Sequence, residues 1–174
     1  MPKSSPLVPT AQAALEKRDP AKELEVAPGR AVRRWAKGEA TLQELKSYTD
    51  EELYCIAQSG YTLFLNGKVK DAQVVFEGLI AIDPRNDYYY RALGVVYHRQ
   101  GDAEGAIRQF THAVTVDPKS AAAYVNRAEV HISRRDLPQA LSDLEAAVGA
   151  SGDLSHPIAR KALALRKLLR RKLR

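Results

Sequence analysis

The chain has 174 residues, enough for one domain with extensions, and 45% of them are hydrophobic and 28% charged, as in an ordinary helical globular protein. No run approaches the ~20 apolar residues of a membrane span, so we expect no stable membrane association. The segment from Met1 to Thr10 lacks an apolar run, and we expect no secretory signal there. The single cysteine, Cys55, excludes an intramolecular disulfide and suits a reducing compartment, which predicts a cytoplasmic protein.

The net charge of +6 is concentrated at one end of the sequence. Residues 158–174 carry eight Lys/Arg and no Asp/Glu, and the rest of the chain holds 19 basic against 21 acidic residues. The body is therefore mildly acidic, and the basic character belongs to a terminal segment. We expect no nucleic acid as the main partner.

The first part of the chain divides into two segments. Residues 1–29 hold five of the nine prolines and predict a flexible Pro-rich arm. Residues 30–48 predict an N-terminal helical segment with one short helix around Trp35 and another over Thr41 to Leu45. Trp35, Leu42 and Leu45 are candidate contacts of a homodimer, and local packing is the alternative for Trp35.

A period of 34 residues organises the chain from Leu53 onward. Small residues at two recurring positions let the two helices of a unit approach closely. A phenylalanine or leucine four residues after the second of these positions fills space between units, and proline ends the second helix of the first two units. The positions that recur are Gly60, Gly94 and Ala128; Ala72, Ala106 and Ala140; Phe76, Phe110 and Leu144; Leu79, Ala113 and Ala147; Gly67 and Gly101 with Arg135; and Pro84 and Pro118 with Gly152.

These residues at this spacing resemble the tetratricopeptide-repeat (TPR) consensus, which implies an all-α solenoid of three tandem helix-turn-helix units over residues 49–152. A capping box at Thr49 and Glu52 predicts where the repeats begin. The predicted helices span 53–66, 69–82, 87–100, 103–116, 121–134 and 137–149.

A basic helix over about 157–173, within the segment 153–174, follows the repeats. Its apolar residues form one stripe (Ile158, Ala162, Leu165, Leu169 and Leu173), which favours a capping helix over the third unit. The alternative is a docking arm for an acidic lipid, nucleic acid or protein.

The sequence predicts no enzyme and no cofactor. The four histidines (His98, His112, His131 and His156) have no partner at the spacing of metal ligands. Cys55 is interpreted as a buried, inert thiol, and the glycines form no phosphate-binding loop.

Recognition is therefore the expected function. In a TPR stack the first helix of each unit lines the concave face, mainly through its positions 2, 5, 9 and 12. Tyrosine suits such a groove because its ring buries area and its hydroxyl can bind a peptide backbone. The predicted peptide-binding groove comprises Tyr54, Ala57, Tyr61, Phe64, Tyr88, Arg91, Val95, His98, Val125 and Glu129. The clamp that other TPR domains use for acidic chaperone tails is replaced here by Ala57, Tyr61, Ala122 and Asn126.

A weaker sequence motif begins before the repeats and continues into the first one. It comprises Gly38 through Leu45, Thr49 to Leu53, Gly60-Tyr61, Gly67-Lys68 and Asp71-Ala72 to Phe76. This run resembles class II (translocator) chaperones of bacterial type III secretion. The resemblance implies a protein that binds an extended segment of a secreted, pore-forming translocator, of roughly Pro-x-Leu-x-x-Pro type, and keeps that translocator soluble before export. A generic TPR scaffold or adaptor is the alternative.

Overall fold

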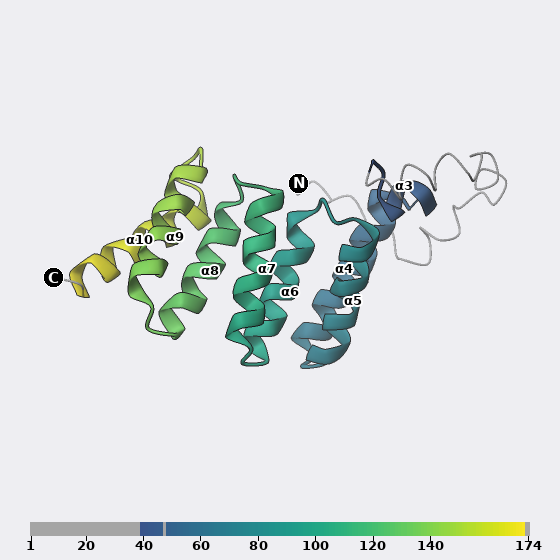
Figure 1. Ribbon diagram of the computed structural model, residues 1–174, viewed down its shortest axis with the longest axis horizontal. Helices are drawn as coiled ribbons and strands as arrows, with labels where there is room; N and C mark the ends of the chain where they lie inside the picture. Colours follow the sequence, from purple (N-terminus) through teal and green to yellow (C-terminus); the bar gives the residue numbers. More distant parts are fainter. Residues whose placement is uncertain (1–38, 47, 173–174) are drawn as a thin grey trace, which may run out of the picture.

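The computed structural model describes residues 39–46 and 48–172, and every regular element among them is a helix. The helices follow one another across the molecule from α3 and α4 at one end to α10 at the other (Figure 1). Their bounds are α3 (Leu42–Lys46), α4 (Asp50–Leu65), α5 (Val69–Ile82), α6 (Asp87–Arg99), α7 (Ala103–Val116), α8 (Ala121–Ser133), α9 (Leu137–Ala150) and α10 (Pro157–Lys172).

The predicted helices are confirmed, most of them to within one residue at each end. The exception is α4, which begins at Asp50 because Thr49 caps it. The Thr49 hydroxyl oxygen accepts from the Glu52 amide at 3.2 Å, and the Glu52 carboxylate accepts from the Thr49 amide at 2.9 Å. The predicted arm 1–29 and Trp35 lie outside the described residues, and α3 is described without the side chains of Leu42 and Leu45.

The recurring small residues lie where the two helices of each unit meet. A Cβ atom added at Gly94 would lie 2.5 Å from a ring carbon of Phe110, and one added at Gly60 would lie 2.8 Å from Val75. The alanines and large apolar residues that complete these contacts are almost completely buried: Ala72, Ala106, Ala140, Phe76, Phe110 and Leu144. The helix pairs α4–α5, α6–α7 and α8–α9 are therefore the three repeat units.

In every unit, one residue between the two helices has a left-handed backbone conformation. Gly67 and Gly101 have φ values of 77° and 83°, and Arg135 occupies the same place in the third unit with φ 63°. Glycine adopts this conformation without the steric penalty that other residues meet. The third turn thus keeps the geometry of the first two despite its arginine.

The basic helix α10 packs against α8 and α9, at the end of the stack (Figure 1). Ala162 and Leu169 of the predicted stripe are buried in the core of the third unit, and Ile158 and Leu165 of the stripe pack partly buried against it. Ala159, outside the predicted stripe, is buried as well. Lys161 and Arg170 pair with Glu129 and Glu145 of that unit at 2.7 and 2.5 Å. The predicted capping helix is confirmed.

Candidate functional site

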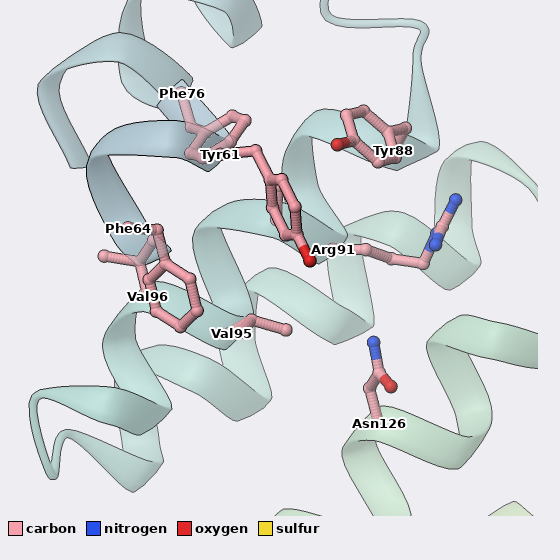
Figure 2. A pocket seen from close by; sticks show the side chains of 9 residues that line it. Tyr61, Phe64, Phe76, Tyr88, Arg91, Val95, Val96 and Asn126 are labelled. Carbon is pink, nitrogen blue, oxygen red and sulfur yellow. The ribbon is translucent and has the colours of Figure 1, made fainter. Parts of the chain in front are cut away.

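An apolar pocket opens between the first helices of the repeat units. It has a volume of about 140 Å³, with Phe76 and Val96 buried at its base. Figure 2 shows that Tyr61 and Phe64 from α4 lie over this space, with Val95 from α6 and Asn126 from α8 at its edge. The residues that line it are Tyr61, Phe64, Phe76, Tyr88, Arg91, Ala92, Val95, Val96 and Asn126.

A second, more polar pocket lies next to the first. It has a volume of about 310 Å³, and Tyr88 lines both pockets. Its lining residues are Asp50, Tyr54, Ala57, Gln58, Asp83, Asn86, Tyr88 and Tyr89. We call the two adjoining pockets together the A-helix groove, because α4, α6 and α8 supply most of their lining.

Helical spacing explains why tyrosines point into this groove. Tyr54 and Tyr61 are seven residues apart on α4, which is two turns, so both side chains lie on one face of the helix. They are 49% and 48% exposed, whereas Leu53 on another face of α4 is buried in the core. Aromatic rings that are about half exposed and border the two pockets are available for contact with a ligand.

Tyr88 is held firmly at the junction of the two pockets. Its ring packs edge-to-face against Tyr89 with centroids 6.0 Å apart. Burial raises the pKa of the Tyr88 hydroxyl, with Arg91 acting in the opposite direction and Tyr61 and Tyr54 in the same one. The hydroxyl therefore keeps its proton at neutral pH and can donate a hydrogen bond into the groove.

Arg91 is the only basic residue among the described residues that line the groove. Its Nε donates to Asp87 at 2.7 Å, and the guanidinium carbon lies 5.5 Å from the centroid of the Tyr88 ring. The Ser120 hydroxyl donates to the same oxygen of Asp87, also at 2.7 Å. Arg91 is thereby held by Asp87 and Tyr88 of its own helix, and Asp87 is held in turn by Ser120 at the start of α8.

The structure brings most of the predicted groove residues together. Seven of the ten line the two pockets: Tyr54, Ala57, Tyr61, Phe64, Tyr88, Arg91 and Val95. His98 is exposed near the end of α6 but lines neither pocket. Glu129 lines neither pocket and pairs with Lys161 of α10.

The prediction for Val125 is wrong. Its side chain is completely buried, in a cluster with Leu144 of α9 and Ala162 of α10. The capping helix and its own partner helix enclose this position of the third unit, so Val125 offers no surface to a ligand.

Several groove residues were missed by the sequence reasoning. Asp83 and Asn86 lie in the connection between α5 and α6, where the repeat positions assign no groove residue. Asn126 stands one position after Val125 on α8, and the sequence indicated only that it does not match a carboxylate clamp. The signal available in the sequence was a polar amide next to an apolar residue on the predicted helix.

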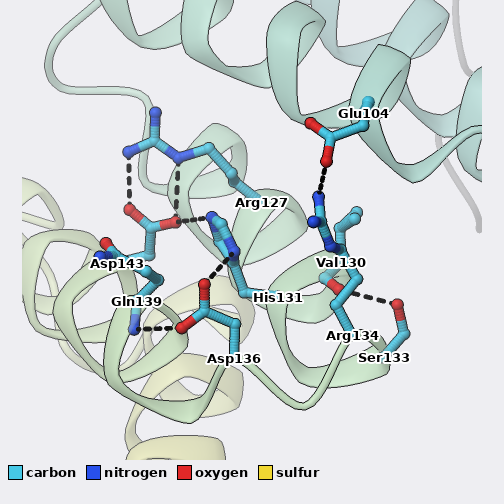
Figure 3. A network of polar contacts seen from close by, with 9 residues as sticks. All are labelled: Glu104, Arg127, Val130, His131, Ser133, Arg134, Asp136, Gln139 and Asp143. Carbon is cyan, nitrogen blue, oxygen red and sulfur yellow. Dashed lines mark hydrogen bonds and ion pairs between the residues drawn. The ribbon is translucent and has the colours of Figure 1, made fainter.

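A separate polar network joins the helices of the third unit (Figure 3). Arg127 of α8 makes two hydrogen bonds with Asp143 of α9, at 2.6 and 2.9 Å, and these bonds raise the pKa of the guanidinium. His131 lies 3.6 Å from Asp136 and 3.9 Å from Asp143. The two hydrogen bonds between the oppositely charged Arg127 and Asp143 side chains hold α8 against α9. This pair therefore has a structural role.

Three further expectations from the sequence concern metal ligands, the cysteine and membrane spans. Within residues 39–46 and 48–172, no three His, Cys, Asp or Glu side chains are grouped so that they could hold a metal ion. Cys55 is buried, as predicted. None of the described helices is long and apolar enough to cross a membrane.

Sequence comparison identifies a similar protein. Low calcium response locus protein H of Yersinia pestis is 30% identical over 105 residues, which cover 60% of this chain and 61% of that protein. The match thus spans about three-fifths of the length of that curated relative.

Solved structures share the fold. The type III secretion translocator chaperone SycD of Yersinia enterocolitica superposes with a TM-score of 0.70 at 19% identity, covering 74% of this chain and 98% of that one. SycD in complex with a peptide of the translocator YopD gives a TM-score of 0.65 at 19% identity, covering 72% and 98%. The resemblance to translocator chaperones seen in the sequence is confirmed by these similarities.

The family model for the tetratricopeptide repeat matches residues 59–114 and 99–155, which together make up more than half of the sequence. The matched residues run from within α4 to beyond the end of α9, so they include most of the three helix pairs. The chain therefore belongs to the tetratricopeptide-repeat family.

Proposed function

We propose that this protein is a non-enzymatic cytoplasmic chaperone that holds an extended, partly apolar segment of a type III secretion translocator in its A-helix groove. Holding the segment lowers the concentration of free, aggregation-prone translocator before export. The observation that carries the proposal is the apolar pocket lined by the half-exposed ring of Tyr61 and the partly buried ring of Phe64. A structure of the same fold is described as a complex with a translocator peptide, which supports this choice of ligand.

The chemistry of the groove suits an extended chain. Tyr61, Phe64 and Val95 can bury apolar side chains of a ligand, and the hydroxyls of Tyr54 and Tyr88 can bond its backbone. A segment that crosses both pockets would bury on the order of 1,000–1,600 Å² in total. A homodimer formed through residues 30–48, with Trp35, Leu42 and Leu45 as contacts, is part of the same proposal and does not involve the groove.

A labelled peptide containing Pro-x-Leu-x-x-Pro tests this function by fluorescence anisotropy. We expect micromolar binding to the wild-type protein and at least tenfold weaker binding to a Tyr54→Ala/Tyr61→Ala variant, because two half-exposed rings are lost from the groove. Both side chains are about half exposed, so the variant should fold, which circular dichroism checks.

A matched control removes two apolar side chains from elsewhere on the surface. Leu65 and Val74 are 65% and 69% exposed and line neither pocket, so Leu65→Ala/Val74→Ala should bind like wild type. Equal weakening by both double variants would show that binding does not occur in the A-helix groove.

A further inference from the structure

Arg91 is an unusual residue for an apolar pocket. Its side chain is 24% exposed, and its only hydrogen-bond partner among the described residues is Asp87, through Nε. The two terminal amino groups of the guanidinium make no bond with the described part of the chain. They are donors that a ligand covering the pocket would have to satisfy, because burying a charged donor without an acceptor is costly.

Asn126 adds a second unused polar group at the same pocket. It faces the pocket from α8, and within residues 39–46 and 48–172 its side-chain amide has no hydrogen-bond partner. Figure 2 shows Arg91 and Asn126 on the same side of the pocket, across from Phe64. The two residues together offer several N–H donors next to an apolar site.

The opposite end of the groove has the opposite charge. The polar pocket is lined by the carboxylates Asp50 and Asp83, and no basic side chain lines it. Tyr88 separates this end from the pocket that contains Arg91. A negative group on a ligand is therefore favoured near Arg91 and repelled near Asp50 and Asp83.

We propose that Arg91 and Asn126 select a ligand segment with an acidic side chain next to its apolar anchor, and that the charge difference along the groove fixes the direction of the segment. Asp87, which also accepts a hydrogen bond from Ser120, holds the guanidinium through Nε, so little side-chain freedom is lost on binding. The terminal amino groups can then bind a carboxylate end-on, in a pocket where water is displaced by the apolar anchor. This inference rests on the proposed function, since it concerns the same groove.

The test moves one acidic residue along the peptide. The parent probe contains Pro-Ala-Leu-Ala-Ala-Pro, and glutamate is placed in turn at each of the three alanines, with glutamine at the same position as the neutral reference. For wild-type protein we expect glutamate to bind about tenfold more tightly than glutamine at one position, the gain of one charged hydrogen-bonded contact. At the position nearest Asp50 and Asp83, glutamate should bind more weakly than glutamine.

Protein variants assign the preference to Arg91. Arg91→Gln should bind the glutamate and glutamine peptides equally, and Asn126→Ala should reduce the preference. Arg99→Gln is the matched control, since Arg99 is an exposed arginine on the same helix that lines neither pocket. It should keep the full preference for glutamate.

The outcomes separate this inference from the function on which it rests. If the parent peptide binds but wild-type protein prefers glutamate at no position, the inference is overturned and the proposed function stands. A preference for glutamate that survives in Arg91→Gln also overturns it. Failure of every peptide to bind folded wild-type protein would overturn both. The comparison of peptides on wild-type protein needs no variant to fold.

Discussion

Gly94 and Gly78 illustrate how differently one residue type is used within this repeat protein. Gly94 lies at the crossing of α6 and α7, where the Phe110 ring occupies the space that a side chain would need. Gly78 lies in the middle of α5, and beyond its chain neighbours and the nearby backbone of its own helix no heavy atom lies within 4 Å of where a Cβ would be. The first glycine is required by packing, and the second leaves a helix weaker than it could be.

Replacing each of these glycines by alanine should therefore change stability in opposite directions. Gly94→Ala should lower the free energy of unfolding by about 1–3 kcal/mol, because Phe110 is buried and cannot move aside freely. Gly78→Ala should raise it by up to ~1 kcal/mol, since alanine is the better helix former. Urea denaturation followed by circular dichroism measures both, and a Gly94→Ala protein as stable as wild type would contradict this packing.

At the scale of the elements, α10 completes the stack. The third unit has no fourth repeat to cover it, and Val125, Leu144 and Ala147 are buried together with Ala162 and Leu169 of α10. The helix places its apolar stripe on the unit and turns most of its basic residues to solvent. End units of a solenoid need such a covering because each unit buries apolar surface only against its neighbours.

Removal of residues 157–174 should destabilise the third unit most. We expect a loss of at least about 2 kcal/mol in the free energy of unfolding, from the exposure of the cluster around Leu144. Hydrogen exchange should show faster opening of α8 and α9 than of α4 and α5. The control is Lys167→Ala/Arg171→Ala, which changes exposed charges on α10 and should shift stability by less than about 0.5 kcal/mol. An unchanged α8–α9 exchange rate after truncation would show that α10 is not a cap.

The repeat period predicted the helices well because packing within each unit depends on local residues. Glycine or alanine at one position, alanine at a second and Phe or Leu four residues later are enough to place the helix pairs. The groove residues were harder to predict, because the repeat period implies that side chains at equivalent positions point the same way in every unit. Val125 breaks this rule, since α10 encloses it, and Asp83 and Asn86 enter the groove from a connection that carries no periodic signal.

Across the whole molecule, the A-helix groove links the three units. Its two pockets share Tyr88 and extend from Tyr54 at the start of the first unit to Asn126 in the third. One ligand segment can therefore contact all three units at once, which makes retention of the ligand depend on the intact stack. Outside residues 158–174 the chain holds 19 basic against 21 acidic residues, and no residue of α10 lines either pocket, so the groove and the basic helix are different surfaces.

Site-specific photocrosslinking tests the central claim, that an extended translocator segment lies in the A-helix groove, most directly. We would place p-benzoylphenylalanine at Val95, which is 37% exposed and lines the apolar pocket, and separately at Val74, which is 69% exposed and lines neither pocket. The account predicts that a Pro-x-Leu-x-x-Pro peptide crosslinks at position 95 and that unlabelled peptide suppresses the product, with only background at position 74. Crosslinking at position 74 with none at position 95 would contradict it.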